Sequence, residues 1–404
     1  LWALKARKYR TFMEQAKGYE EPNSLGKCWE LGTHLYCEPD AGLGWFLELT
    51  SVFTGLGYYR NPSSPSQFCK LTRRPSSTVE ERSWYDDPAN AHRCVTLTLQ
   101  DGTEGVLGRD VLATYVLDGK VVSNSPQDVE ELKMALASYE TKWHTPCIGF
   151  LGGEEEWISE DSKKITARAQ IDKFAQRYKD HLNLTKRHKV PMEPDVKYVA
   201  MPSMDASTAL ERAEMKKKPY REIVGTMSYY GRLCHTPVAY GVNMAAQYVS
   251  NPGLAHWRLL KHLAEFSTTQ RESGITFSAP SSGVRQLSLI FDANWAGDAA
   301  SRRSVDNSVI FLWGNCIDYG PRKQKFTAMS SFESELGGCA RGGGRLKAVG
   351  AILLGMGVQL ELPVPAYGDN ESVLNSLTNV THGTSAKHID IRMFWMKLST
   401  ASSR

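Results

Sequence analysis

The sequence LSLIFDANWAGD, residues 287–298, begins with apolar residues typical of a buried β-strand and places Asp292 near the strand end. Glu335 lies in SSFESEL, residues 330–336, which we expect to be helical. Asp369 directly follows a second short apolar run, VPAYG, residues 364–368. An acid on a strand, an acid on a helix and an acid after a later strand form a pattern typical of metal-dependent nucleases. We therefore expect Asp292, Glu335 and Asp369 to form a metal site.

Length and composition limit the class of protein. The chain has 404 residues, more than one ordinary domain needs, and 41% of them are apolar, which supports several globular cores. A net charge of +4 permits a nucleic-acid partner without demanding one. Eight cysteines without a C-x-x-C pair favour reduced thiols, and no apolar run is long enough to span a membrane. We expect an intracellular protein, cytoplasmic or nuclear and not secreted, of a class without membrane contact; the oligomeric state stays open.

The first 150 residues predict a mixed region. Residues 45–53 read as a helix that ends at the glycines near position 55. Residues 60–93 are rich in Pro, Ser, Arg and Asp, so we expect a long exposed loop. Alternating apolar residues predict strands within 95–99 and 111–122, and a helix follows over 127–138.

The middle of the chain is predicted to be mostly helical. Residues 163–189 carry nine Lys and Arg against two Asp, with Ile171, Phe174 and Tyr178 at helical spacing. This pattern fits either a solvated helix on an apolar core or a face that follows nucleic-acid phosphates. Two helices are expected within 219–270, and the loop at 278–283 is the expected domain boundary.

The last third predicts the order β-β-β-α-β-α-α. The elements are strands at 286–293, 308–313, 324–329 and 362–368, and helices at 331–354, 370–377 and 385–398. Five glycines between 337 and 344 weaken the first helix, each by roughly 1 kcal/mol relative to alanine. The run RGGGR, residues 341–345, lacks the Gly-Lys-Ser/Thr ending and the preceding strand of a phosphate loop, so we reject that interpretation.

This order is the order of the ribonuclease H fold, and motifs along almost the whole chain resemble one family. The family is the reverse transcriptase–ribonuclease H region of the Pol polyprotein of copia-type LTR retrotransposons. FMEQAKGY (12–19) resembles YMEQPxGF, YVLD (115–118) stands in the place of YVDD, DANWAGD (292–298) resembles DADWAGD, SSFESE (330–335) resembles SSTEAE, DNES (369–372) resembles DNQSA, and KHIDIR (387–392) matches without change.

The resemblance implies a multidomain α+β or α/β fold. Residues 1–150 would be a degenerate palm and fingers remnant of a reverse transcriptase, and residues 151–283 a mostly helical thumb or connection. Residues 284–404 would be a C-terminally truncated ribonuclease H-like domain. The family's nuclease domain continues past KHIDIR into a fifth strand and a helix with a fourth acid, and this chain stops before both. The chain also begins at Leu1 rather than Met, so we expect a fragment of something longer.

For the palm, the resemblance implies lost chemistry. A polymerase needs carboxylates from two motifs to hold two Mg²⁺ about 3.5–4 Å apart. Leu117 replaces the first Asp of the family's turn, so Asp118 is the remaining polymerase vestige. The family's other palm Asp would lie upstream of Leu1. We therefore expect no DNA synthesis.

For the nuclease, the resemblance assigns Asp292, Glu335 and Asp369 to three family positions that hold two Mg²⁺ or Mn²⁺ ions at the scissile phosphate. Glu335 is preferred to Glu333 because of the family's helix register. The implied partner is an RNA–DNA hybrid or another nucleic acid, and the implied reaction is hydrolysis of the RNA strand. The alternative is a catalytically dead nucleic-acid-binding relic or a decayed fragment.

Overall fold

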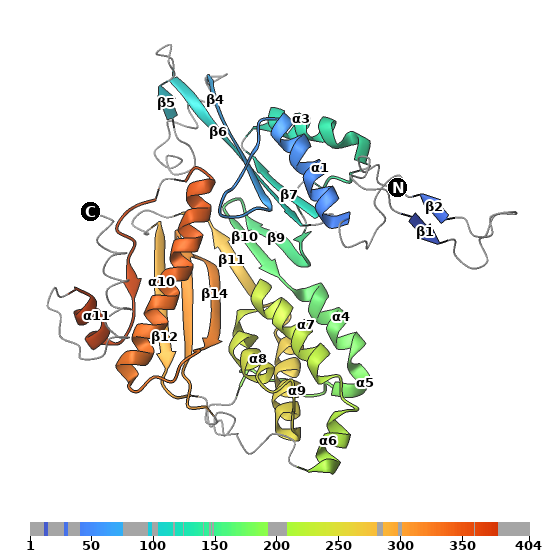
Figure 1. Ribbon diagram of the computed structural model, residues 1–404, viewed down its shortest axis with the longest axis vertical. Coiled ribbons are helices and arrows are strands. Elements are labelled where there is room, and N and C mark those ends of the chain that lie inside the picture. Colours follow the sequence, from blue (N-terminus) through green and yellow to red (C-terminus); the bar gives the residue numbers. More distant parts are fainter. Residues whose placement is uncertain are drawn as a thin grey trace, which may run out of the picture. The chain divides into compact units, whose positions relative to one another are not determined.

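The computed structural model describes two compact units, Leu1–Pro146 with Leu354–Val358, and Cys147–Leu353 with Gln359–Arg404. The described residues are 12–14, 28–30, 41–75, 96–98, 104–115, 118–123, 125–139, 141–144, 147, 149–192, 208–280, 286–297, 301–358 and 360–378. Helices and strands are mixed in both units, which confirms the α+β class (Figure 1). The predicted boundaries at 150 and 283 stay predictions. No described helix is long and apolar enough to cross a bilayer.

The first unit is built on an antiparallel sheet with the order β3-β4-β6-β5, in which β7 also pairs with β6. Its strands are β3 (Tyr59–Arg60), β4 (Gln67–Pro75), β5 (Thr96–Thr98), β6 (Glu104–Tyr115) and β7 (Asp118–Ser123). A separate pair joins β1 (Phe12–Glu14) to β2 (Cys28–Glu30). The expected loop over 60–93 is therefore wrong for β4. Its composition is that of a loop, but Phe68 and Cys69 are fully buried and the strand pairs with β6 along its whole length.

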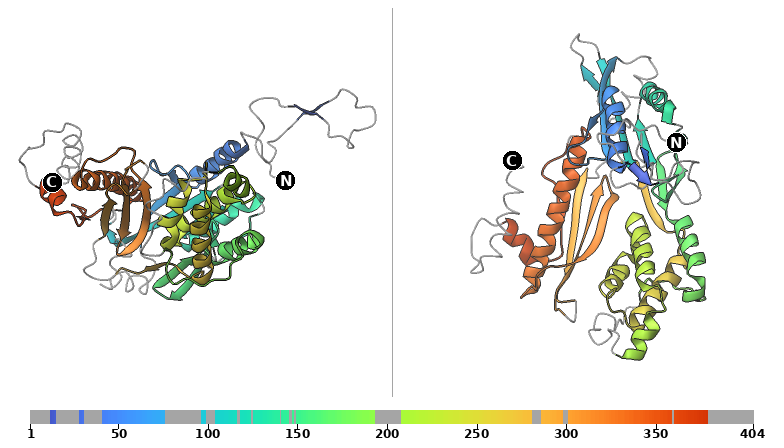
Figure 2. Two further views of the ribbon diagram at one scale, coloured as in Figure 1. Left: turned by 90° about the horizontal axis from the view of Figure 1, so that it is seen from below. Right: turned by 45° about the vertical axis from the view of Figure 1, so that its right-hand side comes forward.

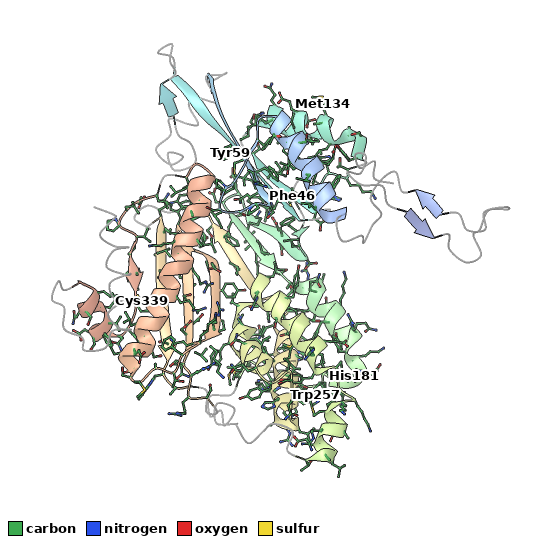
Figure 3. All side chains as sticks on the ribbon, viewed as in Figure 1. Phe46, Tyr59, Met134, His181, Trp257 and Cys339 are labelled. Carbon is green, nitrogen blue, oxygen red and sulfur yellow. The ribbon has the colours of Figure 1, made fainter. Side chains whose placement is uncertain are left out.

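Two helices cover the core of this unit, α1 (Ala41–Gly55) and α3 (Pro126–Leu136), and the short 3₁₀ helix η2 (Ala137–Tyr139) follows. Both helices were predicted. The Ser125 hydroxyl accepts a hydrogen bond from the Asp128 amide and so caps α3. Figure 3 labels Phe46 on α1, whose ring lies 6.2 Å from that of Phe68. The buried core consists of Leu49, Phe53, Tyr58, Phe68, Leu112, Leu132 and Leu136.

The second unit begins with a small sheet and a helical cluster. The sheet has the order β11-β10-β9-β8, and its strands are β8 (Gly149–Phe150), β9 (Gly153–Ser159), β10 (Ser162–Thr166) and β11 (Gly274–Ser278). The helices are α4 (Arg168–Arg177), α5 (Lys179–Leu182), α6 (Ala209–Met215), α7 (Tyr220–Leu233), α8 (Ala239–Ala246) and α9 (Leu254–Thr269), with the 3₁₀ helix η4 (Thr236–Val238). Three helical segments therefore occupy the region where two were expected.

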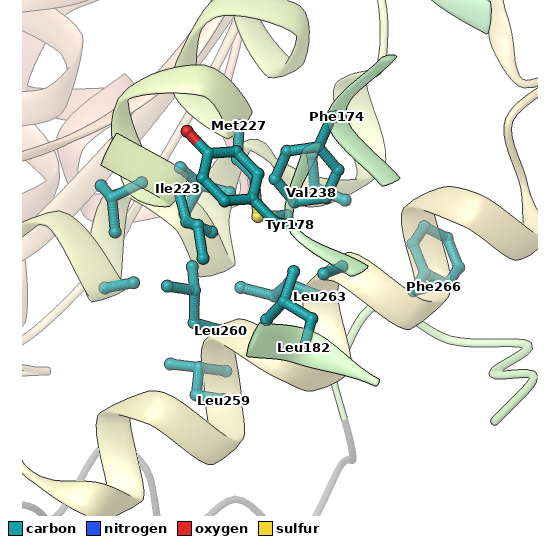
Figure 4. Packing of buried hydrophobic residues seen from close by; sticks show 14 of the residues in the cluster. Phe174, Tyr178, Leu182, Ile223, Met227, Val238, Leu259, Leu260, Leu263 and Phe266 are labelled. Atoms are coloured by element: carbon teal, nitrogen blue, oxygen red, sulfur yellow. The ribbon is translucent and has the colours of Figure 1, made fainter. Parts of the chain in front are cut away.

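Figure 4 shows the core of this helical cluster, where Phe174, Ile223 and Leu263 meet from three helices. Ile171 and Phe174 of α4 are buried, so the basic helix rests on an apolar stripe. Residues 163–166, the start of the segment predicted to be helical, belong to strand β10 instead. Strands β9 and β11 pair with the two edges of β10, so these residues form an inner strand of the sheet.

The second sheet of this unit has the order β14-β13-β12-β15. Its strands are β12 (Leu287–Asn294), β13 (Val305–Leu312), β14 (Asn315–Lys323) and β15 (Ala366–Tyr367). The first three strands are antiparallel neighbours, and β15 pairs with β12 in parallel. Helices α10 (Ser331–Gly355) and α11 (Glu371–Thr378) follow β14 and β15, so the described order is β-β-β-α-β-α. Figure 2 shows α10 along one face of the sheet.

The third strand differs from the prediction. We placed it at 324–329 with a turn at 315–316, but the turn is Trp313-Gly314 and the strand starts at Asn315. Both turn residues have positive φ, +48° and +78°, which is the geometry of a tight type I′ hairpin. The apolar run that ends at Trp313 hid this turn, because a tryptophan rarely takes a left-handed conformation.

Helix α10 is continuous despite its glycines. A β-carbon at Gly338 would lie 3.3 Å from the Asp306 Cβ, and one at Gly342 would lie 3.2 Å from a Leu289 methyl. These glycines therefore let the helix approach β12 and β13 closely. Gly344 has no atom within 4 Å of its added β-carbon, so only its propensity cost remains.

Candidate metal centre

Strand β12 positions the first acid. Its burial alternates along the strand: Leu289, Phe291 and Ala293 are buried, whereas Ile290 and Asp292 are exposed. The Asp292 carboxylate is thus held at the strand end while its neighbours anchor the strand in the core.

The parallel partner β15 positions Asp369. Ile290 of β12 lies opposite Tyr367 of β15, so two residues farther along both chains Asp292 and Asp369 reach the same level. Gly368 makes the close approach possible, because a β-carbon there would lie 2.5 Å from the Phe291 ring. Both aspartates are exposed.

Helix α10 supplies the third acid. The Ser330 hydroxyl accepts from the Glu333 amide at 3.1 Å, and Glu333 Oε2 accepts from the Met329 amide at 2.8 Å. Glu333 thus stabilises the start of the helix. Half a turn later, Glu335 Oε1 accepts a hydrogen bond from the Ala293 amide at 3.2 Å, which ties α10 to β12.

The three predicted residues converge. Oxygen atoms of Asp292, Glu335 and Asp369, one from each residue, all lie within 4.8 Å of one another. Glu335 is only 6% exposed, and its Oε2 is buried without a hydrogen-bond partner. A buried carboxylate oxygen without a hydrogen-bond partner is costly, so this atom is suited to binding a cation.

Burial raises the pKa of Glu335 to about 7, and the negative charges of Asp292, Asp369 and Asp306 add to the rise. The Ala293 amide opposes it by bonding to the carboxylate. Among the described residues, no lysine or arginine pairs with any member of the trio. Mutual repulsion without a side-chain cation makes the cluster a place where a bound cation would be strongly favoured.

The donor set fits a hard divalent cation. All three residues offer carboxylate oxygens, which Mg²⁺ and Mn²⁺ prefer, and no described His or Cys belongs to the cluster, as a zinc site would favour. The two exposed aspartates leave the cluster open on one side, so a further oxygen ligand from a substrate could approach. The residues therefore fit the cation that the sequence pattern predicts.

Sequence reasoning missed the polar support behind the trio. Arg341 of α10 forms an ion pair with Asp306 of β13, which is buried beside Glu335. The Trp295 indole donates to the Ala328 carbonyl at 3.1 Å and joins the loop after β12 to the loop before α10. The spacing of Glu335 and Arg341 on one helix was the available signal, but it does not reveal the partner strand.

Asp118, the predicted polymerase vestige, lies elsewhere. It begins β7, pairs in register with Tyr115 of β6 and is exposed. It belongs to no group of three potential ligands within the described part of the chain. Leu117, KHIDIR (387–392) and the predicted helix at 385–398 lie outside the described residues.

Comparisons with known proteins place the chain beside transposon proteins. It is 22% identical over 389 residues to the retrovirus-related Pol polyprotein from transposon TNT 1-94 of Nicotiana tabacum, a match of 96% of this chain and 26% of the relative. It is 24% identical over 380 residues to the corresponding polyprotein from transposon RE1 of Arabidopsis thaliana, covering 94% of this chain and 23% of the relative. The chain thus spans about a quarter of the length of these relatives.

A shorter relative matches part of the chain. The secreted RxLR effector protein 161 of Plasmopara viticola is 33% identical over 121 residues, which are 30% of this chain and 84% of that protein. No protein-family model and no solved structure matches the chain.

The two long polyprotein matches cover nearly the whole chain and agree with the motifs spread along it. The chain is thus similar over nearly its whole length to retrovirus-related Pol polyproteins of copia-type transposons, which confirms the resemblance that its motifs carry.

Proposed function

We propose that the chain is a ribonuclease H-derived metal-dependent nuclease that hydrolyses the RNA strand of an RNA–DNA hybrid. The observation that carries the proposal is the convergence of Asp292, Glu335 and Asp369 around the partnerless Oε2 of Glu335. The order β-β-β-α-β-α around the trio supports a ribonuclease H-like domain.

In this proposal the three carboxylates hold two Mg²⁺ or Mn²⁺ ions. When bound, such ions supply Lewis-acid stabilisation of the charge that develops on the reacting phosphate. The protein's own contribution is positional. The Ala293 amide orients Glu335, and the parallel pairing of β12 and β15 keeps Asp292 and Asp369 level with each other. The raised pKa of Glu335 leaves this carboxylate partly protonated at neutral pH without a cation, so cation binding would release a proton.

The first unit enters this proposal as a palm remnant without polymerase activity. Hard carboxylate ligands are needed to hold polymerase Mg²⁺, and leucine at 117 supplies none. Asp118 also belongs to no group of three potential metal ligands among the described residues, which supports the same conclusion. Template-dependent incorporation of deoxynucleotides that disappears in Asp118→Asn would contradict it.

The test is cleavage of a labelled RNA strand in an RNA–DNA hybrid with Mg²⁺, with Mn²⁺ and with EDTA. We expect cleavage that needs the divalent ion and is absent on DNA duplexes, because contacts to the 2′-hydroxyl select RNA. Asp292→Asn should abolish it. Glu371→Gln is the matched control, since Glu371 is an exposed acid near Asp369 but outside the trio. Cleavage that survives in Asp292→Asn would refute the assignment of the site.

A non-catalytic nucleic-acid-binding protein is the second candidate. The basic segment around α4 and α5 favours it, because Lys173, Lys179 and Arg187 are exposed on a helical cluster anchored by its apolar stripe. Binding of the hybrid that weakens steeply with salt, without cleavage at any Mn²⁺ concentration, would support this candidate over the nuclease.

A further inference from the structure

An arginine-lined cavity lies within the second unit, away from the acid trio. Its volume is about 570 Å³, which is in the range of small-molecule sites. Helices α7 and α8 form one wall, and β14 and α10 form the other, and α8 and β14 are neighbours in Figure 1. Four arginines line it: Arg232 of α7, Arg322 of β14, and Arg341 and Arg345 of α10.

Two of these arginines are fixed in place. Arg345 Nε and Nη2 contact the two Asp318 oxygens at 2.8 and 2.6 Å, and Nη1 donates to the Ser308 hydroxyl at 2.6 Å. Arg341 pairs with Asp306, yet its Nε is buried without a hydrogen-bond partner. The fixed pair thus forms a rigid basic floor with one unused donor.

The other two arginines are free. Arg232 and Arg322 are exposed, and neither has an ion-pair partner among the described residues. Among the described residues, two carboxylates, Asp306 and Asp318, form ion pairs with these four guanidinium groups, so positive charge is in excess at the cavity. Burial lowers the pKa of Arg341, and the nearby charges of Arg345 and Arg322 lower it further. The cations repel one another where burial weakens solvent screening.

We propose that this cavity binds a phosphate group carried by a small ligand of nucleotide size. Guanidinium groups match phosphate oxygens by bidentate hydrogen bonds, and one exposed arginine on each wall, together with the fixed basic pair on α10, can surround a dianion. The remaining wall suits an organic body, since Met227, Ala239 and Val242 are apolar. The Tyr319 hydroxyl donates to the Gly231 carbonyl at 2.7 Å and holds the two walls together.

The cavity does not contain the acids of the proposed nuclease. None of Asp292, Glu335 and Asp369 lines it, and the two arginines chosen for the test, Arg232 and Arg322, form no ion pair with the trio or with Asp306 among the described residues. RGGGR (341–345) therefore meets an anion through side chains on a helix rather than through a loop of backbone amides. Phosphate binding can succeed or fail whatever the outcome of the cleavage test.

Isothermal titration of the whole chain with inorganic phosphate, AMP and adenosine, at constant ionic strength and without divalent ions, tests the proposal. Arg322→Gln and Arg232→Gln should each weaken phosphate or AMP binding by about tenfold or more, as expected for loss of a charged hydrogen-bonding pair. Arg221→Gln is the matched control, because Arg221 is an exposed arginine on the same helix as Arg232 but outside the cavity. Thermal melting checks that every variant folds.

AMP that binds more tightly than phosphate would support a nucleotide as ligand, and equal affinities would support the phosphate group alone. Adenosine should not bind. The proposal is overturned if neither phosphate nor AMP binds to the unmodified chain. It is equally overturned if the Arg322→Gln and Arg221→Gln variants bind them alike.

Discussion

The two units differ in whether a side-chain cation neutralises their clustered carboxylates. In the first, Asp128 of α3 meets Lys70 of β4 at 2.5 Å, and both side chains are nearly buried. Glu131 lies 3.5 Å from the same ammonium group. In the second, Asp292, Glu335 and Asp369 gather without a described lysine or arginine partner. An acidic cluster whose cation is a side chain is closed to ligands, whereas one without such a cation is suited to a metal ion.

The largest expected effect is a loss of hybrid cleavage on substitution of an acid of the trio, but not on substitution of Asp118. Asp369→Asn should reduce hybrid cleavage by at least about a hundredfold, the order expected when a group that stabilises transition-state charge is removed. Asp118→Asn should leave cleavage unchanged, because Asp118 is an exposed residue of the β6–β7 hairpin. Initial rates measured with both variants give the comparison. Equal losses would mean that the trio is not the catalytic centre.

Removing the lysine should destabilise the first cluster. Lys70→Met takes the ammonium group away from the nearly buried Asp128, so the free energy of unfolding should fall by about 3–5 kcal/mol. Lys133→Met is the control, since its pair with Glu130 is more exposed and should contribute less than about 1 kcal/mol. Urea unfolding curves at pH 7 measure both. A small loss in Lys70→Met would show that Asp128 needs no cation.

The acid trio should affect how the stability of the protein depends on pH. The pKa of Glu335 is raised to about 7 in the folded protein, from 4.5. Below pH 4.5 Glu335 is protonated in both states and costs nothing. As pH rises towards 7 the unfolded state loses the proton first, so the folded state becomes less stable by up to about 3 kcal/mol. This loss is complete above pH 7.

Glu335→Gln should remove that loss, because glutamine keeps the oxygen that accepts from the Ala293 amide. The variant should be more stable than the unmodified chain at pH 8 without metal, and Mg²⁺ should no longer raise its melting temperature. Melting curves between pH 5 and pH 8 with EDTA or Mg²⁺ provide the measurement. Identical pH profiles for the two proteins would contradict the raised pKa.

The smallest effects concern the helix that carries Glu335. Gly338→Val should destabilise the protein by about 1–3 kcal/mol, because its added methyl groups would meet Asp306 and Ala293. Gly344→Ala should stabilise it by up to about 1 kcal/mol, since its β-carbon enters open space. Chemical denaturation of both variants tests the pair. A stabilising effect of Gly338→Val would show that α10 does not need the close approach to the sheet.

The order of elements in the second unit could be predicted because its signals are local. The apolar alternation of β12, the acid near the end of β12 and the acid after β15 can be recognised in the sequence. Failures arose where tertiary contacts decide. The glycines of α10 were interpreted as weakening the helix, yet Gly338 and Gly342 allow it to pack against the sheet. Strand β4 was assigned to a loop because its pairing partner, β6, lies some 30 residues farther along the chain.

The three acids of the candidate site could be predicted from the sequence, but the side chains that surround them could not. The resemblance supplied Asp292, Glu335 and Asp369, and the structure brings them together. The buried Asp306–Arg341 pair behind them joins a strand to a helix 35 residues later, and no local pattern links the two. The arginine cavity was hidden for the same reason, since its four arginines come from three elements.

The short edge strand β15 makes Asp369 the most easily displaced of the three acids. Of the residues after α10 that the structure describes, Ala366 and Tyr367 alone form a ladder with β12, and the Leu289 amide donates to the Pro365 carbonyl at 3.1 Å beside them. Opening so short an edge costs far less than unfolding the sheet. Asp369 can therefore detach while Asp292 and Glu335 stay in place. Exchange of the Leu289 amide with deuterium should report this opening, and a cation that binds all three acids should slow the exchange.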